Sequence, residues 1–461
     1  MSGIPLATGQ NELEINPGVA RSSSRSSAGW YDALSAHLVL FPTLVFAIHF
    51  VLVQTVGSLA LRHGAASSGY ESAKARLGYQ LPGHESLPSF ILPFTRWDGI
   101  WFSYSARYSS TIRLGSSMEQ FGGAGDSLWP LLTWVMRASA RLSGIQPELM
   151  GFAFVNICLA GALIALYQLM LIDFDIAIAR RALWCLVLFP TSFFFHAIYP
   201  EAIFLFFVAS CLLASKRNHW VIAGMMGLLA ALTRSQGILL IVPMVIIFFN
   251  QGLPRPRTQF LASVFLLMPL LGPVIRLWNL NHSGMTWQIE LRMQRGQLRD
   301  HEPIWSAFDC AVSGCSRMTF FVSNHVSQWN PAVKWQWAID AIHHPSWNLV
   351  TSTGWRREVA MSGSLGLIVT VGCLLLAVVG LFRLPLWMNG YVIAMLMLAL
   401  IRTPALDPFD HMPRFALLLF PLAIVLATVL NDRLTRIILG SLSAALLVFF
   451  TLQFVNWYWV A

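Results

Sequence analysis

Long apolar runs separated by short polar turns make up most of this chain. About 20 apolar residues cross the hydrocarbon core of a bilayer as a helix, and twelve segments approach that length. They lie near residues 36–59, 128–143, 150–171, 182–198, 200–215, 219–233, 236–250, 258–278, 360–382, 385–402, 415–430 and 435–459. The pattern predicts an all-α polytopic membrane protein with roughly 11–12 transmembrane helices.

Two long polar intervals, at about 60–127 and 279–358, interrupt these runs and are predicted to be extra-cytoplasmic loops. The first has large aromatic residues at positions 97, 101, 104 and 108, which share one face of a helix lying in the membrane interface. The second contains seven tryptophans, whose amphipathic rings favour the headgroup region. Residues 1–33 are polar and read as a disordered cytoplasmic tail, and 34–461 as one transmembrane domain.

Short basic loops indicate the orientation of the helices. Arginine and lysine doublets favour the cytoplasmic side, and they occur at 180–181, 216–217, 255/257 and 433/436. The turn at 196–201 is then external. A full crossing at 128–143 would place Arg180 outside, so either that segment is re-entrant or one of its neighbours does not span.

Composition agrees with a lipid environment. Charged residues make up 11% of the chain, against about 25% in ordinary soluble proteins, and the mean hydropathy is +0.62. The net charge of +9 is spread over short doublets, which suits anionic headgroups and argues against a nucleic-acid partner. Cys310 and Cys315 share a polar loop and can form a disulfide in an oxidising compartment. The cysteine and histidine spacings predict no metal site.

The first candidate for chemistry is Arg96-Trp97-Asp98, which lies between the first two apolar runs. A carboxylate just outside a membrane helix, beside aromatic rings, can act as a general base for a sugar hydroxyl. Alternatively, Asp98 caps the interfacial helix that begins there and Arg96 anchors it at the membrane surface. The two interpretations are compatible.

Further carboxylates lie at the ends of apolar runs. Glu119 and Asp126 precede the segment 128–143 and are either site residues or part of a loop tip with a helix cap. Glu201 opens a helix after the turn Phe189–Pro200, where it can also serve as a helix-dipole carboxylate. His196 in that turn is interpreted as a packed histidine.

Two arginines are candidate partners for these carboxylates or for a phosphate. Arg234 can bind a lipid phosphate, pair with Glu201, or serve as a cytoplasmic arginine. Arg414 lies at the start of a late membrane helix, where it can clamp an anionic headgroup or act as an interfacial anchor.

The order of these motifs resembles the PIG-V family. The motifs are Arg96-Trp97-Asp98 after the first helix, the helix start Trp129-Pro130-Leu131-Leu132, the segment Phe189–Glu201, Thr233-Arg234-Ser235-Gln236-Gly237, and Pro413-Arg414-Phe415. The resemblance covers about residues 90–240 and, loosely, 405–430. Founding members of this family are mannosyltransferases that add the second mannose to GPI-anchor precursors. They belong to the GT-C superfamily, whose multi-spanning members use polyprenyl-phosphate sugars.

The resemblance implies a GT-C-like helix bundle and an inverting transfer of a mannosyl or other hexosyl group. The donor would be a polyprenyl- or dolichyl-phosphate sugar, and the acceptor a lipid-linked sugar or glycan. Asp98 would be the catalytic base. Substrate-binding positions would be Arg96, Trp97, Glu119, Asp126, Glu201, Arg234 and Arg414. No cofactor other than the donor lipid is implied, and nothing supports a divalent metal.

The chain departs from the family near residues 118–130, where eukaryotic members carry an acidic motif rich in His, Glu and Trp. The chain therefore looks closer to the bacterial relatives. This favours the bacterial plasma membrane as its location, with the endoplasmic reticulum membrane as the alternative for a eukaryote.

Two other functions fit the same pattern. A transporter or flippase of lipid-linked sugars could use the same acids and arginines, and a non-catalytic membrane subunit could use Asp98 only as a cap. The charged residues lie at helix ends and in loops rather than along the middle of helices, which favours an enzyme acting at the membrane surface.

Overall fold

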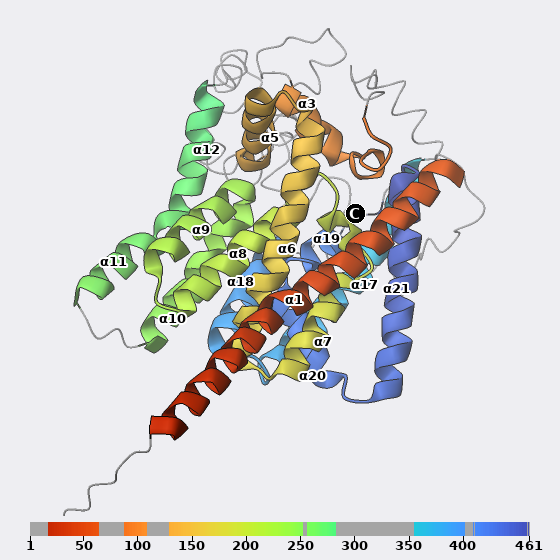
Figure 1. The fold of residues 1–461 in the computed structure, drawn as a ribbon. Helices are drawn as coiled ribbons and strands as arrows, with labels where there is room; N and C mark the ends of the chain where they lie inside the picture. Colours follow the sequence, from red (N-terminus) through yellow and green to blue (C-terminus); the bar gives the residue numbers. More distant parts are fainter. Residues whose placement is uncertain are drawn as a thin grey trace, which may run out of the picture.

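The computed structural model describes residues 17–63, 87–107, 129–251, 256–282, 355–401, 409, 411–458 and 460. Within these ranges the secondary structure consists of α- and 3₁₀-helices (Figure 1). The protein is an all-α polytopic membrane protein, as the apolar pattern predicts. Three helical stretches are long and apolar enough to cross a bilayer, namely His37–His63, Pro147–Asp173 and Arg433–Val455, and six shorter apolar helices accompany them.

Most of the helices coincide with predicted apolar segments, although several of those segments are divided. The α-helices are α1 (Pro17–His63), α3 (Asp98–Arg107), α5 (Pro130–Ser143), α6 (Pro147–Asp173), α7 (Ile176–Val187), α8 (Glu201–Lys216), α9 (Trp220–Thr233), α10 (Ile241–Gln251), α11 (Pro256–Leu266), α12 (Leu271–His282), α17 (Trp355–Gly380), α18 (Leu386–Ile401), α19 (Met412–Ala416), α20 (Phe420–Val429) and α21 (Arg433–Val455). The 3₁₀-helices are η2 (Leu92–Phe94), η3 (Ser192–Phe195), η4 (Ser235–Leu240) and η5 (Met268–Leu270).

Four of the predicted segments are broken. The segment 182–198 splits into the end of α7 and η3, and 236–250 splits into η4 and α10. The segment 258–278 splits into α11, η5 and α12, and 415–430 into α19 and α20. Proline lies near several of the breaks, where it removes a backbone donor and clashes with the preceding turn. Irregular backbone at membrane depth is tolerated where other protein surrounds it, and η3 is buried along its whole length.

The helix α5 is shorter than the apolar segment predicted at 128–143. Its 14 residues rise about 21 Å along the axis, which is short of the hydrocarbon thickness of about 30 Å. It packs against α3 and α6 at the end of the bundle where α6 begins (Figure 1). Whether 128–143 is re-entrant or a neighbouring segment does not span stays a prediction of the charge pattern.

The first helix begins earlier than predicted. Residues 17–33, which the sequence analysis assigns to a disordered tail, are helical and continue into the first membrane segment. Extending an existing helix is much easier than nucleating one, and Pro17 occupies a first-turn position that proline tolerates well.

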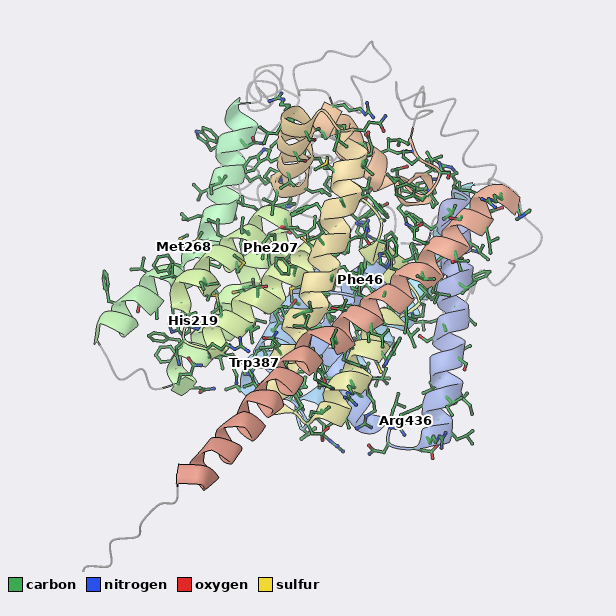
Figure 2. All side chains as sticks on the ribbon, in the orientation of Figure 1. Phe46, Phe207, His219, Met268, Trp387 and Arg436 are labelled. Carbon is green, nitrogen blue, oxygen red and sulfur yellow. The ribbon has the colours of Figure 1, made fainter. Side chains whose placement is uncertain are left out.

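The basic doublets gather at one end of the bundle. Lys216 Nζ lies 3.0 Å from Asp173 Oδ1 at the end of α6, and Arg181 Nη1 donates to the carbonyl of Leu430 at 3.0 Å. Arg436 lies at this end too, away from α3 and α5 (Figure 2). This arrangement is the one that the positive-inside argument predicts, and it leaves α3 and α5 at the opposite end.

A buried polar network holds η3 against α1 and α6. His196 Nδ1 lies 2.6 Å from Asn156 Oδ1, His196 Nε2 lies 2.9 Å from His49 Nδ1, and His49 Nε2 lies 3.0 Å from Ser192 Oγ. Asn156 donates its amide to the Phe152 carbonyl, so its oxygen accepts from His196. The proton of His196 is therefore assigned to Nδ1 from this hydrogen-bond pattern. His196 is packed, as the sequence interpretation states, but its partner His49 was not singled out.

Gly237 sets the path of the chain from α9 into η4. A Cβ at this position would lie 2.3 Å from the nitrogen and 2.4 Å from the Cα of Ala231. These are backbone atoms that cannot move away without shifting α9. The glycine therefore permits the sharp reversal that follows Arg234.

We expect Gly237→Ala to destabilise the protein by about 1–3 kcal/mol or more, because the added methyl group overpacks a backbone contact. Gly372→Ala in α17 is the matched control, since a Cβ there meets nothing within 4 Å and alanine favours a helix. The midpoint of thermal unfolding in detergent, read by fluorescence-detected size exclusion, should fall for Gly237→Ala only. Equal midpoints for the two variants would contradict this role for Gly237.

Candidate active site

Two turns meet at the centre of the candidate site. The backbone N–H of Ile198 donates to the carbonyl of Phe94 at 2.9 Å, which joins the turn before α8 to η2. The hydroxyl of Tyr199 accepts from the N–H of Asp98 at 3.0 Å and donates to the carbonyl of Arg96 at 3.2 Å. Tyr199 thus fixes the backbone on both sides of Trp97, directly where α3 begins.

A four-residue charge cluster forms around Arg414. Arg414 Nη1 donates to Asp98 Oδ2 at 2.8 Å, while its Nε and Nη2 donate to Glu201 Oε1 at 3.0 and 2.8 Å. Arg234 donates from Nη1 to the same oxygen of Glu201. Two carboxylates and two guanidinium groups therefore neutralise one another. All four residues are candidate site residues from the sequence, and of the alternatives for Arg234 the structure shows the pair with Glu201.

The two carboxylates differ sharply in exposure. The side chain of Glu201 is fully buried, whereas that of Asp98 is 35% exposed. Asp98 is therefore the carboxylate of this cluster that an incoming molecule can reach. Asp98 is also the first residue of α3. It therefore lies at the start of the helix, as the alternative interpretation states, and at the same time bonds to Arg414.

Glu201 retains one unused acceptor. Both arginines bind its Oε1, and its Oε2 is buried with no hydrogen-bond partner among the described residues. A buried carboxylate oxygen without a donor is unfavourable.

Aromatic rings of the 189–201 motif enclose Arg414. Its guanidinium carbon lies 4.6 Å from the ring centre of Tyr199 and 5.1 Å from that of Phe194, close enough for cation–π attraction. Burial alone would lower the pKa of Arg414, but Glu201 and Asp98 outweigh burial and hold the pKa above its usual value. Thr191 at the start of the motif bonds the carbonyl of Pro413 at 2.7 Å, so the motif also positions the short helix α19.

Tyr199 stays protonated in this environment. Burial raises the pKa of its hydroxyl well above the usual value, and the charge of Asp98 raises it further. A protonated hydroxyl can accept from one backbone group while donating to another, as the two bonds of Tyr199 require.

The end of the chain closes one side of the site. The ring of Trp457, just after α21, lies 5.6 Å from that of Trp97 and 4.7 Å from the guanidinium carbon of Arg96. Trp97 and Trp457 both have positive φ angles, 53° and 66°, which are uncommon for bulky residues. Such strain typically persists where the surrounding structure imposes it, often at functional sites.

Sequence reasoning missed Tyr199 and Trp457 as site residues. Tyr199 belongs to the 189–201 motif and is two residues before Glu201. That closeness in sequence to a candidate carboxylate could have marked Tyr199 as a site residue. Trp457 carried no signal of its own. Glu119 and Asp126 lie outside the described residues, and their membership of the site stays a prediction. Among the residues that the structure describes, no group of three or more metal-ligating side chains occurs.

Neither protein families nor curated proteins supply a relative for this chain. No protein-family model matches the chain, and no curated protein matches it significantly. The functional interpretation therefore rests on the geometry of the charge cluster and on the motifs that led to it.

Proposed function

We propose that this protein is a membrane glycosyltransferase that moves a mannosyl or other hexosyl group from a polyprenyl- or dolichyl-phosphate sugar to a lipid-linked or glycan acceptor. The observation that carries the proposal is the cluster of Asp98, Glu201, Arg234 and Arg414, in which one carboxylate is partly exposed. Its place beside the interfacial helix α3 suits a substrate whose lipid part stays in the membrane (Figure 1).

Asp98 acts as the general base. It takes the proton of the acceptor hydroxyl while that oxygen forms a bond to the anomeric carbon of the sugar. The bond from the anomeric carbon to the phosphate oxygen breaks at the same time, and the lipid phosphate leaves with the electron pair. Attack from the face opposite the phosphate inverts the anomeric configuration. Phosphate is a good leaving group, so no second carboxylate is needed as a general acid.

Arg414 orients the base. Its three hydrogen bonds go to the two carboxylates, and Glu201 fixes it from the buried side. Bonding through Oδ2 of Asp98 holds the carboxylate in one orientation. Arg414 therefore positions Asp98 rather than binding an anionic headgroup, the role that its place in the sequence suggests.

Arg234 and Glu201 contribute to substrate binding. Arg234 shares Glu201 Oε1 through Nη1 and contacts Gln236 through Nε, and its positive charge stabilises the leaving phosphate. Glu201 is fully buried and contributes by holding Arg234 in place. Arg234 therefore favours a substrate that carries a phosphate.

A transporter or flippase of lipid-linked sugars is the second candidate. Broken helices that present charged residues near their breaks are typical of transporters. Arg234 immediately precedes η4, and Glu201 begins α8 after the break that contains η3. Transport would need no proton acceptor, so the two functions differ in their dependence on Asp98.

Asp98→Asn should lower transferase activity about 100- to 10,000-fold, the usual range for losing a general base. Membranes containing the protein would be given radiolabelled polyprenyl-phosphate mannose and lipid acceptors, and label transfer would be measured. Asp173→Asn is the matched control, because Asp173 pairs with Lys216 near the opposite end of the bundle.

Equal label incorporation by wild type and Asp98→Asn would refute the role of Asp98 as base. If the wild type transfers no label but carries labelled lipid across sealed vesicles, the flippase function is correct instead.

Glu201→Gln should destabilise the fold by about 3–5 kcal/mol, because it leaves two buried guanidinium groups without their shared counter-ion. Asp98→Asn should change stability by about 1 kcal/mol or less, since a partly exposed ion pair contributes little. Unfolding midpoints in detergent would be compared for the two variants. A loss for Asp98→Asn as large as that for Glu201→Gln would mean that Asp98 is structural.

A further inference from the structure

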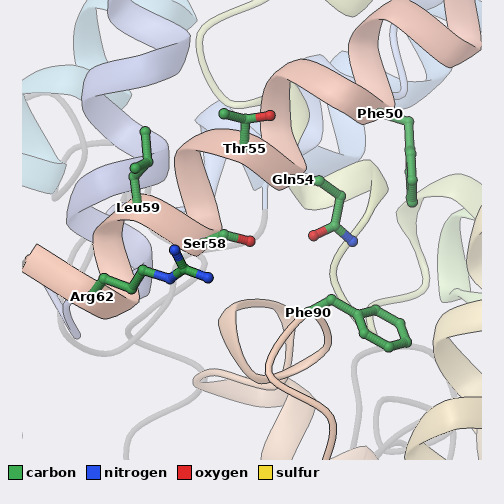
Figure 3. A pocket seen from close by; sticks show the side chains of 7 residues that line it. All are labelled: Phe50, Gln54, Thr55, Ser58, Leu59, Arg62 and Phe90. Atoms are coloured by element: carbon green, nitrogen blue, oxygen red, sulfur yellow. The ribbon is translucent and has the colours of Figure 1, made fainter.

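A groove of about 480 Å³ lies beside the C-terminal half of α1. Side chains of α1 form one wall, and Phe90, which precedes η2, forms the other (Figure 3). None of the four residues of the charge cluster lines it. The groove is therefore separate from the candidate active site.

The lining of the groove changes from apolar to cationic along α1. Phe50, Gln54, Ser58 and Arg62 are four residues apart, which places them along one side of the helix. Figure 3 shows the guanidinium of Arg62, the hydroxyl of Ser58 and the carboxamide of Gln54 in a row, with Phe90 opposite. From Phe50 to Arg62 the helix rises about 18 Å.

Gln54 indicates that the groove is made for a polar ligand. Both its amide nitrogen and its amide oxygen are buried, and neither has a hydrogen-bond partner among the described residues. Anchoring at the membrane surface accounts for Arg62. It does not account for the buried amide of Gln54, which lies about two helical turns from Arg62 along α1. A ligand with an acceptor and a donor group satisfies both atoms of the amide.

The position of the groove selects an amphiphile. Arg62 lies in the last turn of α1, at the end of the bundle that also holds α3 (Figure 1). If α1 crosses a bilayer, Arg62 lies at headgroup depth and Phe50 within the hydrocarbon layer. A guanidinium and a hydroxyl at headgroup depth complement a phosphate, and the aromatic part below complements an acyl chain.

We propose that this groove binds an anionic phospholipid. The phosphate is held by Arg62 and Ser58, a headgroup hydroxyl or ester carbonyl meets Gln54, and an acyl chain lies against Phe50 and Phe90. This site does not depend on the transferase function.

Occupancy of the groove supports the segment that carries Asp98. On the neighbouring face of α1, a Cβ at Gly57 would lie 3.1 Å from both Phe94 and Pro93, so α1 and η2 are already in close contact there. A lipid beside Phe90 fills the space between α1 and residues 87–98. The bound lipid thereby supports this segment from the side of the groove.

The test uses the purified full chain, stripped of lipid and returned to nanodiscs of mixed phosphatidylglycerol and phosphatidylcholine. Native mass spectrometry then counts the lipids that remain bound. We expect the wild type to retain phosphatidylglycerol preferentially, and Arg62→Gln to retain about tenfold less, because a charge-assisted bond to phosphate is lost. Ser58→Phe, which fills the groove, should abolish retention. Arg433→Gln, which removes an exposed arginine at the other end of the bundle, should leave it unchanged.

Three results would overturn the proposal. One is equal retention of the two lipids by the wild type, and another is equal retention of phosphatidylglycerol by the wild type and both groove variants. The third is full displacement of the lipid by glycerol phosphate alone, which would mark a site for a free phosphate ester. Unfolding midpoints confirm that each variant is folded before its lipids are counted.

Discussion

The structure of the candidate site depends on the bond between Arg414 and the buried carboxylate of Glu201. A fully buried carboxylate is unstable without compensating charge, and here two arginines provide it. Arg414 is in turn held between the rings of Phe194 and Tyr199. Once placed, its remaining nitrogen reaches Asp98 at the edge of the site. The orientation of the exposed carboxylate is thus set by the buried one.

This arrangement requires broken helices. A continuous helix would keep its polar backbone satisfied internally and could not turn to deliver Tyr199 and Glu201 together. In this protein η3 provides the break between α7 and α8, and η4 provides the break after α9. The network from His49 to Ser192 holds the first break, and the close approach of Gly237 to Ala231 holds the second. The irregular segments are stable because packed protein surrounds them.

The two ends of the bundle differ in their electrostatics. At the end that holds the basic doublets, Lys216 and Asp173 form a separate pair, with side chains 17% and 21% exposed. At the other end, the buried Glu201 is shared by two arginines, and Arg414 lies against two aromatic rings and reaches the partly exposed Asp98. The proposed lipid groove beside α1 adds the cationic Arg62 to this second end, near the segment that leads to Asp98.

The sequence by itself determined the helices and the candidate charges. Helix positions follow from apolar length and proline, which act locally, and charged residues are rare enough in this chain that Asp98, Glu201, Arg234 and Arg414 stood out individually. Their pairing was decided only by tertiary structure. Asp98 and Arg414 are 316 residues apart, and no local pattern specifies which helix ends meet. For the same reason, the sequence did not identify Trp457 as a site residue. Its contacts with Arg96 and Trp97 depend on how α21 packs against the segment that leads into α3.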